Sequence, residues 1–198
     1  MIIGITGPSG SGKSLASQFF KEKGFEVIDF DELSRKVTQK GSECLDELRA
    51  VFGEKVFAPD GTLLRRELGD IVFADGKKLS ILNSITHKYI LEEADKLIKM
   101  YAEKNIIFDA PLLFEAELDK KCDYTISILA SPDVRIKRIC ERDGISEKSA
   151  INRIKSQKSD SFYLEKSDFS VCNNTDVSSL RLELANILRR KAYEPAIK

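Results

Sequence analysis

The chain has 198 residues, 42% of them apolar, and its 32 basic and 32 acidic side chains give a formal net charge of zero. This length supports one sizeable hydrophobic core with a lobe or lid added. The balanced charge excludes a global field that would attract nucleic acid or an anionic membrane, and no apolar run approaches the roughly 20 residues that span a bilayer. A metal cage built from histidines is excluded, because His87 is the only histidine.

Residues 2–6, IIGIT, form a short apolar run, which predicts a buried strand. A helical pattern follows from Ser14 and stops at Gly24, and residues 25–29, FEVID, predict a second strand. A strand, a helix and a strand within so few residues are typical of a βαβ unit in a parallel sheet.

Residues from about 32 to 103 carry helical spacing, interrupted by a turn signal, APDGT, at 58–62. We interpret this segment as a helical block inserted between two strands, and not as a second globular domain.

The rest of the chain predicts three more strands, at 105–110, 124–130 and 169–173. A helix with Ser131 as its N-cap and Pro132 in first position ends at Gly144, and Ser146 caps the next helix. Residues 177–190 predict a last amphipathic helix, and we expect the tail from 191 to 198 to be loosely held.

The glycine-rich stretch from Gly7 to Ser14, GPSGSGKS, fits the pattern G-x-x-x-x-G-K-[ST] at every fixed position. Small residues let successive main-chain N–H groups wrap a phosphate, and the following helix adds a favourable dipole. Lys13 supplies a cation for the β- and γ-phosphates, and the Ser14 hydroxyl can bind Mg²⁺. The alternative, a flexible turn before a helix, does not require this pattern. We therefore expect ATP contacts at Gly10, Ser11, Gly12, Lys13, Ser14 and Leu15.

Carboxylates follow two of the predicted strands. Asp109 ends the strand IIFD, where a residue near the metal is expected, although an ordinary strand-terminal aspartate is the alternative. Asp29 and Asp31 lie at the carboxyl end of the second strand, where open α/β sheets bind ligands. Either of these two could accept the proton of an alcohol.

Arg135, Arg138 and Arg142 are spaced by three and four residues, which places them on one helix face, and Arg153 follows on the next helix. Such a helix–turn–helix suits a lid that closes over ATP and stabilises developing charge. The alternative is a solvated basic face paired with nearby acidic residues, namely Glu141, Asp143 or Glu147.

A phosphate-binding loop alone does not identify an activity. A motor or transporter ATPase normally has more chain, or a more obvious partner surface, than this sequence shows. A GTPase needs N-K-x-D after a strand, and the NNTD at 173–176 lacks the lysine. A small-molecule kinase needs an acceptor lobe, a base and cations over the phosphoryl group, and all three have candidates. The acceptor of such a kinase could be a nucleotide or another alcohol. A hypothesis of a different class is an ATP-binding regulatory or interaction protein without turnover, but mere binding does not require an acceptor base.

Taken together, several motifs resemble the dephospho-CoA kinase family, from Met1 to about Arg189. They are IGITG with SGSGKS, VIDFDELSR, FG with DGTLLRRELGDIVF, ITHKYI, DAPLLFEA and ERDGISEKSAINRIKSQ. The loop motif alone is widespread, but the combination is specific. The resemblance implies transfer of the γ-phosphoryl group of ATP to the ribose 3′-hydroxyl of 3′-dephospho-CoA, with Mg²⁺ as cofactor.

The resemblance also implies residue roles. Asp31 matches the proposed base, Asp29 a supporting residue, and Asp109 a residue that holds Mg²⁺ through water. Arg142 and Arg153 match ATP-binding lid positions, with Arg142 also catalytic alongside Lys13.

On the acceptor side, the resemblance implies contacts from Arg65 and His87, although a lone histidine can equally be a core group. We expect Leu113 and Phe114 to border the acceptor pocket and Leu112 to continue the sheet core.

Two stretches depart from the family pattern. Pro8 and Ser9 replace Gly-Ile and Leu15 replaces a threonine, which leaves the lysine and the metal-binding hydroxyl in place. Lys88 stands where proline is usual, so the acceptor side can differ.

We therefore predict an α/β, P-loop NTPase three-layer sandwich of the nucleoside-monophosphate-kinase type, with a parallel five-stranded sheet. A single domain comprises a core (1–33, 100–135 and 160–198), a helical acceptor-binding block (34–99) and a lid (136–159). The four cysteines form no CxxC pair and no signal peptide precedes the first predicted strand, so we expect a cytoplasmic protein. ATP and 3′-dephospho-CoA are the expected partners, without nucleic acid or membrane, and a monomer is favoured.

Overall fold

The computed structural model describes residues 1–193, so the end of the predicted tail, 194–198, lies outside the described residues. The chain divides into two compact units. Unit 1 comprises Met1–Val27 and Glu103–Lys198, and unit 2 comprises Ile28–Ala102. The predicted division into core, acceptor-binding block and lid remains a prediction.

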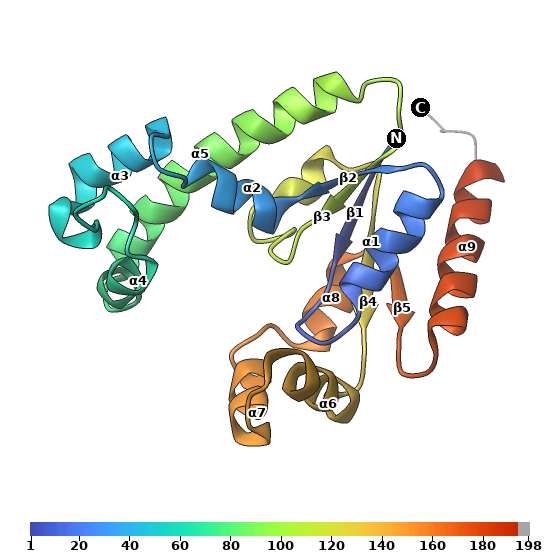
Figure 1. The fold of residues 1–198 in the computed structure, drawn as a ribbon. Helices are drawn as coiled ribbons and strands as arrows, with labels where there is room; N and C mark the ends of the chain where they lie inside the picture. The colour runs from blue at the N-terminus through green and yellow to red at the C-terminus, as the bar shows by residue number, and fades with distance from the viewer. Residues whose placement is uncertain (194–198) are drawn as a thin grey trace. The chain divides into compact units, whose positions relative to one another are not determined.

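A five-stranded sheet forms the centre of unit 1, although the last two residues of one strand, Ile28 and Asp29, are counted with unit 2 (Figure 1). Its strands are β1 (Ile2–Thr6), β2 (Glu26–Asp29), β3 (Ile106–Asp109), β4 (Tyr124–Leu129) and β5 (Phe169–Cys172), in the order β2-β3-β1-β4-β5. The pairs β1–β3, β1–β4 and β4–β5 are parallel. The predicted α/β fold with a parallel five-stranded sheet is confirmed. Because β1 lies between β3 and β4, the loop that follows it opens at the switch point where such sheets bind ligands.

Side-chain alternation along the strands explains the layers. Ile3 and Ile5 are fully buried and belong to one apolar cluster with α1 (Lys13–Glu22) and α9 (Val177–Tyr193). These two helices lie side by side on one face of the sheet, while α8 (Asp160–Lys166), which the sequence analysis did not predict, packs against β4 and β5 (Figure 1). α9 also includes the first three residues of the tail that was expected to be loose.

Unit 2 is helical, as predicted for the inserted block, and has its own core. It contains α2 (Phe30–Val37), α3 (Glu43–Phe52), the short 3-10 turn η1 (Glu54–Val56), α4 (Arg65–Phe73) and the long α5 (Gly76–Met100). Leu45, Leu48, Val56, Val72 and Ile85 are among the buried residues that these helices bring together.

Two helices of unit 1 begin at the predicted serines. α6 (Pro132–Asp143) starts after Ser131, but the Ser131 side chain makes no capping bond; instead its N–H donates to Asn174 Oδ1 at 2.7 Å. Gly144 ends the helix in the left-handed conformation with φ 64°. α7 (Glu147–Lys155) has the predicted cap, because Ser146 Oγ accepts from the Ser149 N–H.

The segment after β3 differs from the expectation. Leu112 is 57% exposed, so the prediction that it continues the sheet core was wrong, and Leu113 is fully buried instead. The chain leaves the strand after Asp109 and turns, which ends the strand alternation and directs Leu113 toward β1. A short 3-10 turn, η2 (Leu118–Lys121), then leads to β4.

The four cysteines are free thiols. Burial raises the pKa of Cys44 to about 11 and that of Cys122 to about 12, so neither thiol is a nucleophile near neutral pH. Among residues 1–193, no helix is both long and apolar enough to cross a bilayer.

Candidate active site

Glycines shape the loop between β1 and α1. Gly10 and Gly12 have φ of 80° and 96°, in the left-handed region that favours glycine. A Cβ atom on Gly12 would also lie 2.1 Å from Asn173 Nδ2, and one on Gly7 would lie 2.2 Å from the Ile128 carbonyl oxygen. Only glycine fits at these positions, and the loop leads directly into the N-terminus of α1 at Lys13.

Two carbonyl groups of the loop accept hydrogen bonds from side chains that are distant in the sequence. Arg138 Nη1 donates to the carbonyl oxygens of Gly10 (3.3 Å) and Ser11 (3.4 Å), and Asn173 Nδ2 donates to Ser11 O at 2.8 Å. In a trans peptide bond the C=O of one residue and the N–H of the next point in opposite directions. When Arg138 and Asn173 bind the carbonyl oxygens of Gly10 and Ser11, the N–H groups of Ser11 and Gly12 therefore point away from these two side chains. This geometry suits the predicted phosphate cradle.

Arg135 is not part of a solvated basic face. It is 3% exposed, and its Nε donates to the Ser9 carbonyl oxygen at 2.9 Å. Burial lowers the pKa of its guanidinium, while the nearby Asp160 carboxylate opposes that shift. Arg135 and Arg138 therefore contact the main chain of the loop, a role that the helical spacing alone did not indicate.

Lys13 and Asp109, two predicted site residues of unit 1, lie together. Lys13 Nζ forms an ion pair with Asp109 Oδ1, and Ser17 Oγ donates to Asp109 Oδ2 at 2.6 Å. Asp109 is 7% exposed, whereas Ser14 is exposed at the start of α1. Sequence reasoning missed Ser17, although its spacing of four residues from Lys13 places it on the same helix face.

Arg142 and Arg153 also lie together, because both contact one carboxylate. Arg142 donates to Asp143 through Nε (2.7 Å) and Nη2 (3.0 Å), and Arg153 Nη1 donates to Asp143 Oδ2. The hydrogen bonds from Arg142 and then Arg153 lower the pKa of Asp143 to about 2. Two cations, one from the end of α6 and one from the end of α7, thus lie next to the same carboxylate. Their pairing with Asp143 agrees with the alternative interpretation, in which these arginines pair with nearby acidic residues.

The donors at this end of the sheet fit a magnesium ion. Within residues 1–193 no group of three His, Cys, Asp or Glu side chains forms a metal cage. Mg²⁺ needs none, because it keeps several waters and takes one or two protein oxygens together with substrate phosphates. The Ser14 hydroxyl and the Asp109 carboxylate are oxygen donors of this kind.

In unit 2 the two candidate aspartates differ in their contacts. Asp29 is the N-cap of α2, and its Oδ1 accepts from the N–H groups of Asp31 (2.8 Å) and Glu32 (3.0 Å). The Asp31 side chain is exposed in the first turn of the helix. Asp29 therefore positions the main chain that carries Asp31.

Besides Asp31 on α2, the predicted acceptor-binding residues of unit 2 lie on α4 and α5. Arg65, the first residue of α4, donates through Nη2 to Thr38 Oγ1 at 2.6 Å, at the end of α2. His87 is half-buried on α5, and burial lowers its pKa. Lys88 continues α5 without a break and pairs with Glu47 of α3 at 3.2 Å.

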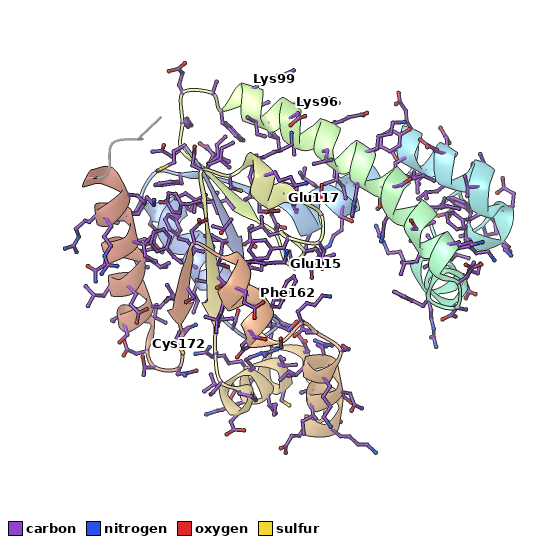
Figure 2. All side chains as sticks on the ribbon, turned by 180° about the vertical axis from the view of Figure 1, so that it is seen from behind. Lys96, Lys99, Glu115, Glu117, Phe162 and Cys172 are labelled. Carbon is purple, nitrogen blue, oxygen red and sulfur yellow. The ribbon has the colours of Figure 1, made fainter. Side chains whose placement is uncertain are left out.

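Leu113 and Phe114 are both buried in unit 1. Leu113 packs toward Gly4 of β1, and the Phe114 ring makes an edge-on contact with Phe162 at 6.0 Å between centroids. Phe162 lies on α8 and is labelled in Figure 2. Lys166 lies over both rings, at 5.8 and 5.5 Å from their centroids. The structure gives Leu113 a packing role, and its contact with the acceptor remains a prediction.

A family model described as dephospho-CoA kinase matches residues 1–179. The dephospho-CoA kinase of Fusobacterium nucleatum is 38% identical over 180 residues, 91% of this chain and 93% of that protein. That of Listeria monocytogenes is 35% identical over 192 residues, 95% of this chain and 96% of its own length. The crystal structure of TT1252 from Thermus thermophilus matches with a TM-score of 0.84 and 26% identity, covering 96% of this chain and 97% of that one.

Proposed function

Because the chain belongs to the dephospho-CoA kinase family, we propose that its glycine loop holds the triphosphate of ATP while Asp31 activates the acceptor hydroxyl. The enzyme is a transferase that phosphorylates dephospho-CoA with ATP to give CoA. The observation that carries the site assignment is the loop itself. Its glycines have positive φ, its carbonyls are held from outside, and Lys13 lies beside Asp109 where α1 begins.

On the donor side, main-chain N–H groups of residues 10–15 and the Lys13 ammonium bind the phosphate oxygens and fix their orientation. Lys13 exchanges its contact with Asp109 for the β- and γ-phosphates when the nucleotide enters. The Ser14 hydroxyl and the Asp109 carboxylate would hold Mg²⁺, which would supply positive charge to the transferring phosphoryl group. Arg142 and Arg153, already paired on Asp143, add positive charge over the nucleotide.

On the acceptor side, the Asp31 carboxylate takes the proton of the ribose 3′-hydroxyl as that oxygen attacks the γ-phosphorus. The bond between the γ-phosphorus and the β,γ-bridging oxygen breaks, and ADP leaves. Its exposure and its place two residues beyond the end of β2 support this role. We assign Arg65, His87, Leu113 and Phe114 to acceptor binding. Arg65 suits a phosphate of the acceptor, because its guanidinium is fixed by Thr38 and carries further N–H donors.

We further propose that the enzyme acts as a cytoplasmic monomer without nucleic-acid or membrane partners. The balanced charge of the chain supports the absence of an electrostatic partner of either kind.

An acceptor panel tests the substrate, with ADP release measured in Mg·ATP and dephospho-CoA, AMP, UMP or shikimate. We expect turnover with dephospho-CoA alone. Preferred turnover with another acceptor would support a different small-molecule kinase, and nucleotide binding without any turnover would support a regulatory protein.

Asp31→Asn tests the base. We expect kcat to fall by orders of magnitude while ATP affinity barely moves, because the base acts on the acceptor. Asp29→Asn is the matched control two residues away, since asparagine caps a helix as well as aspartate does. An unchanged kcat in Asp31→Asn would remove this residue from the mechanism.

A further inference from the structure

Ser9 is the residue of the glycine loop whose polar atoms are most completely occupied by side chains from elsewhere in unit 1. Gln157 Oε1 accepts from the Ser9 N–H at 3.2 Å, and Gln157 Nε2 donates to Ser9 Oγ at 2.8 Å. Arg135 Nε donates to Ser9 O at 2.9 Å. The N–H, the carbonyl and the hydroxyl of Ser9 therefore all have side-chain partners.

The two partner side chains also fix each other. Arg135 Nη2 donates to Gln157 Oε1 at 2.8 Å, and Arg135 Nη1 lies 3.7 Å from Asp160 Oδ1. The Gln157 amide has one orientation in which all three hydrogen bonds form, because Oε1 must face the two N–H donors. In this orientation Nε2 points to the Ser9 hydroxyl. Arg135 is 3% exposed, so these contacts lie in an environment where an unpaired polar group is costly.

We propose that Gln157 and Ser9, joined through Arg135, form a clamp that positions the glycine loop for the nucleotide phosphates, an inference that rests on the proposed ATP site. With its carbonyl held by Arg135, Ser9 fixes the plane of the peptide that supplies the Gly10 N–H. Gln157 is a positioning residue, because it reaches the phosphates only through Ser9.

The clamp also ties the loop to the helix that carries Arg153. Gln157 follows the end of α7, its N–H donates to the Ile154 carbonyl oxygen at 3.1 Å, and Arg153 lies four residues before it. The loop and one of the two proposed phosphate-binding arginines are thus connected by a short stretch of hydrogen-bonded chain. Loss of the clamp is expected to weaken nucleotide binding more than acceptor binding.

A double-mutant cycle tests the clamp, using Ser9→Ala, Gln157→Leu and the double variant. The readouts are the Kd of ATP by calorimetry, kcat, and KM for each substrate. We expect Ser9→Ala to weaken ATP binding about 5-fold and Gln157→Leu about 10- to 100-fold, since Gln157→Leu removes three partly buried hydrogen bonds. Ser9→Ala should add little in the Gln157→Leu background, and KM for dephospho-CoA should stay within about 2-fold. Gln18→Leu, at an exposed position of α1 bonded to Glu22, is the matched control.

Two results would overturn the proposal. One is a loss of thermal stability in Gln157→Leu with an unchanged Kd for ATP, which would leave a purely structural role. The other is full additivity of the two substitutions. Ser9→Ala keeps the experiment decisive if Gln157→Leu fails to fold, because it leaves the Arg135–Gln157 bond in place. Lys13→Ala distinguishes failure of the clamp proposal from failure of the proposed ATP site. If Lys13→Ala binds ATP with wild-type affinity, the proposed ATP site is wrong, independently of the results for Ser9 and Gln157.

Discussion

Gly4 shows at the scale of a single residue how the strand before the loop is packed. It lies in β1, where a Cβ atom would meet Leu113 Cδ2 at 2.8 Å and Cys122 Sγ at 2.9 Å. Both neighbours are side chains, of which Leu113 is fully buried and Cys122 is partly buried. The absence of a side chain at Gly4 is therefore what lets the turn after β3 pack against the central strand.

Gly4→Ala is expected to destabilise the protein by about 1–3 kcal/mol, because the added methyl group overpacks this contact. Urea unfolding monitored by circular dichroism measures the change. Gly76→Ala is the control, since nothing lies within 4 Å of its Cβ position and its φ is not positive. We expect Gly76→Ala to be neutral or slightly stabilising, and equal effects of the two substitutions would contradict the packing argument.

Asp143 gives a second prediction at this scale. Its pKa is lowered to about 2 by Arg142 first and by Arg153 second, so its ion pairs stabilise the fold above the ordinary carboxyl pKa near 3.8. This stabilisation is lost as the pH falls through about 2. Carboxyl ¹³C titration by NMR should show the low pKa, and Arg142→Ala should raise it more than Arg153→Ala does. A wild-type Asp143 titrating near 3.8 would contradict the pairing.

At the scale of an element, the start of α2 connects helix capping to the proposed chemistry. Asp29 ends β2 and caps α2, so one side chain determines where the strand stops and where the first helical turn begins. Asp31 lies in that turn, and its main-chain N–H is one of the two N–H groups that donate to the Asp29 carboxylate.

Asp29→Ala is expected to lower the free energy of unfolding by about 1 kcal/mol, because two N–H groups lose their acceptor. Asp29→Asn should lower it by much less, since the amide oxygen replaces the carboxylate as acceptor. Chemical denaturation of both variants, followed by kcat for each, checks the argument. Equal stability of the two variants would show that the cap contributes little.

At the scale of the whole molecule, the two units have separate hydrophobic cores. Unit 1 contains the glycine loop and the Arg135, Arg138, Gln157 and Asn173 side chains that contact it, whereas unit 2 has its own cluster around Leu48 and Val56. A ligand stabilises the part of the structure that it contacts.

Hydrogen exchange measured by mass spectrometry should therefore show ADP protecting amides of unit 1, with little change in α3 and α4 of unit 2. Dephospho-CoA should add protection in unit 2. Equal protection of both units by ADP alone would contradict the assignment of the nucleotide to unit 1.

The sequence by itself determined what depends on neighbours along the chain. The pattern from Gly7 to Ser14, the apolar run of β1 and the helical block of unit 2 are local, since φ preferences and periodicity act over a few residues. The family followed from several such motifs occurring together.

Only the tertiary structure decided what depends on contacts between distant segments. Arg135 carries the same charge and spacing as Arg142, yet one is buried against the loop and the other is exposed beside Asp143. Gln157, 148 residues after Ser9, has no local signal that links it to the loop. Leu112 and Leu113 are chemically identical, and a turn alone determines which is buried. Burial and partner choice are set by the packing of the whole chain, which a short window of sequence does not contain.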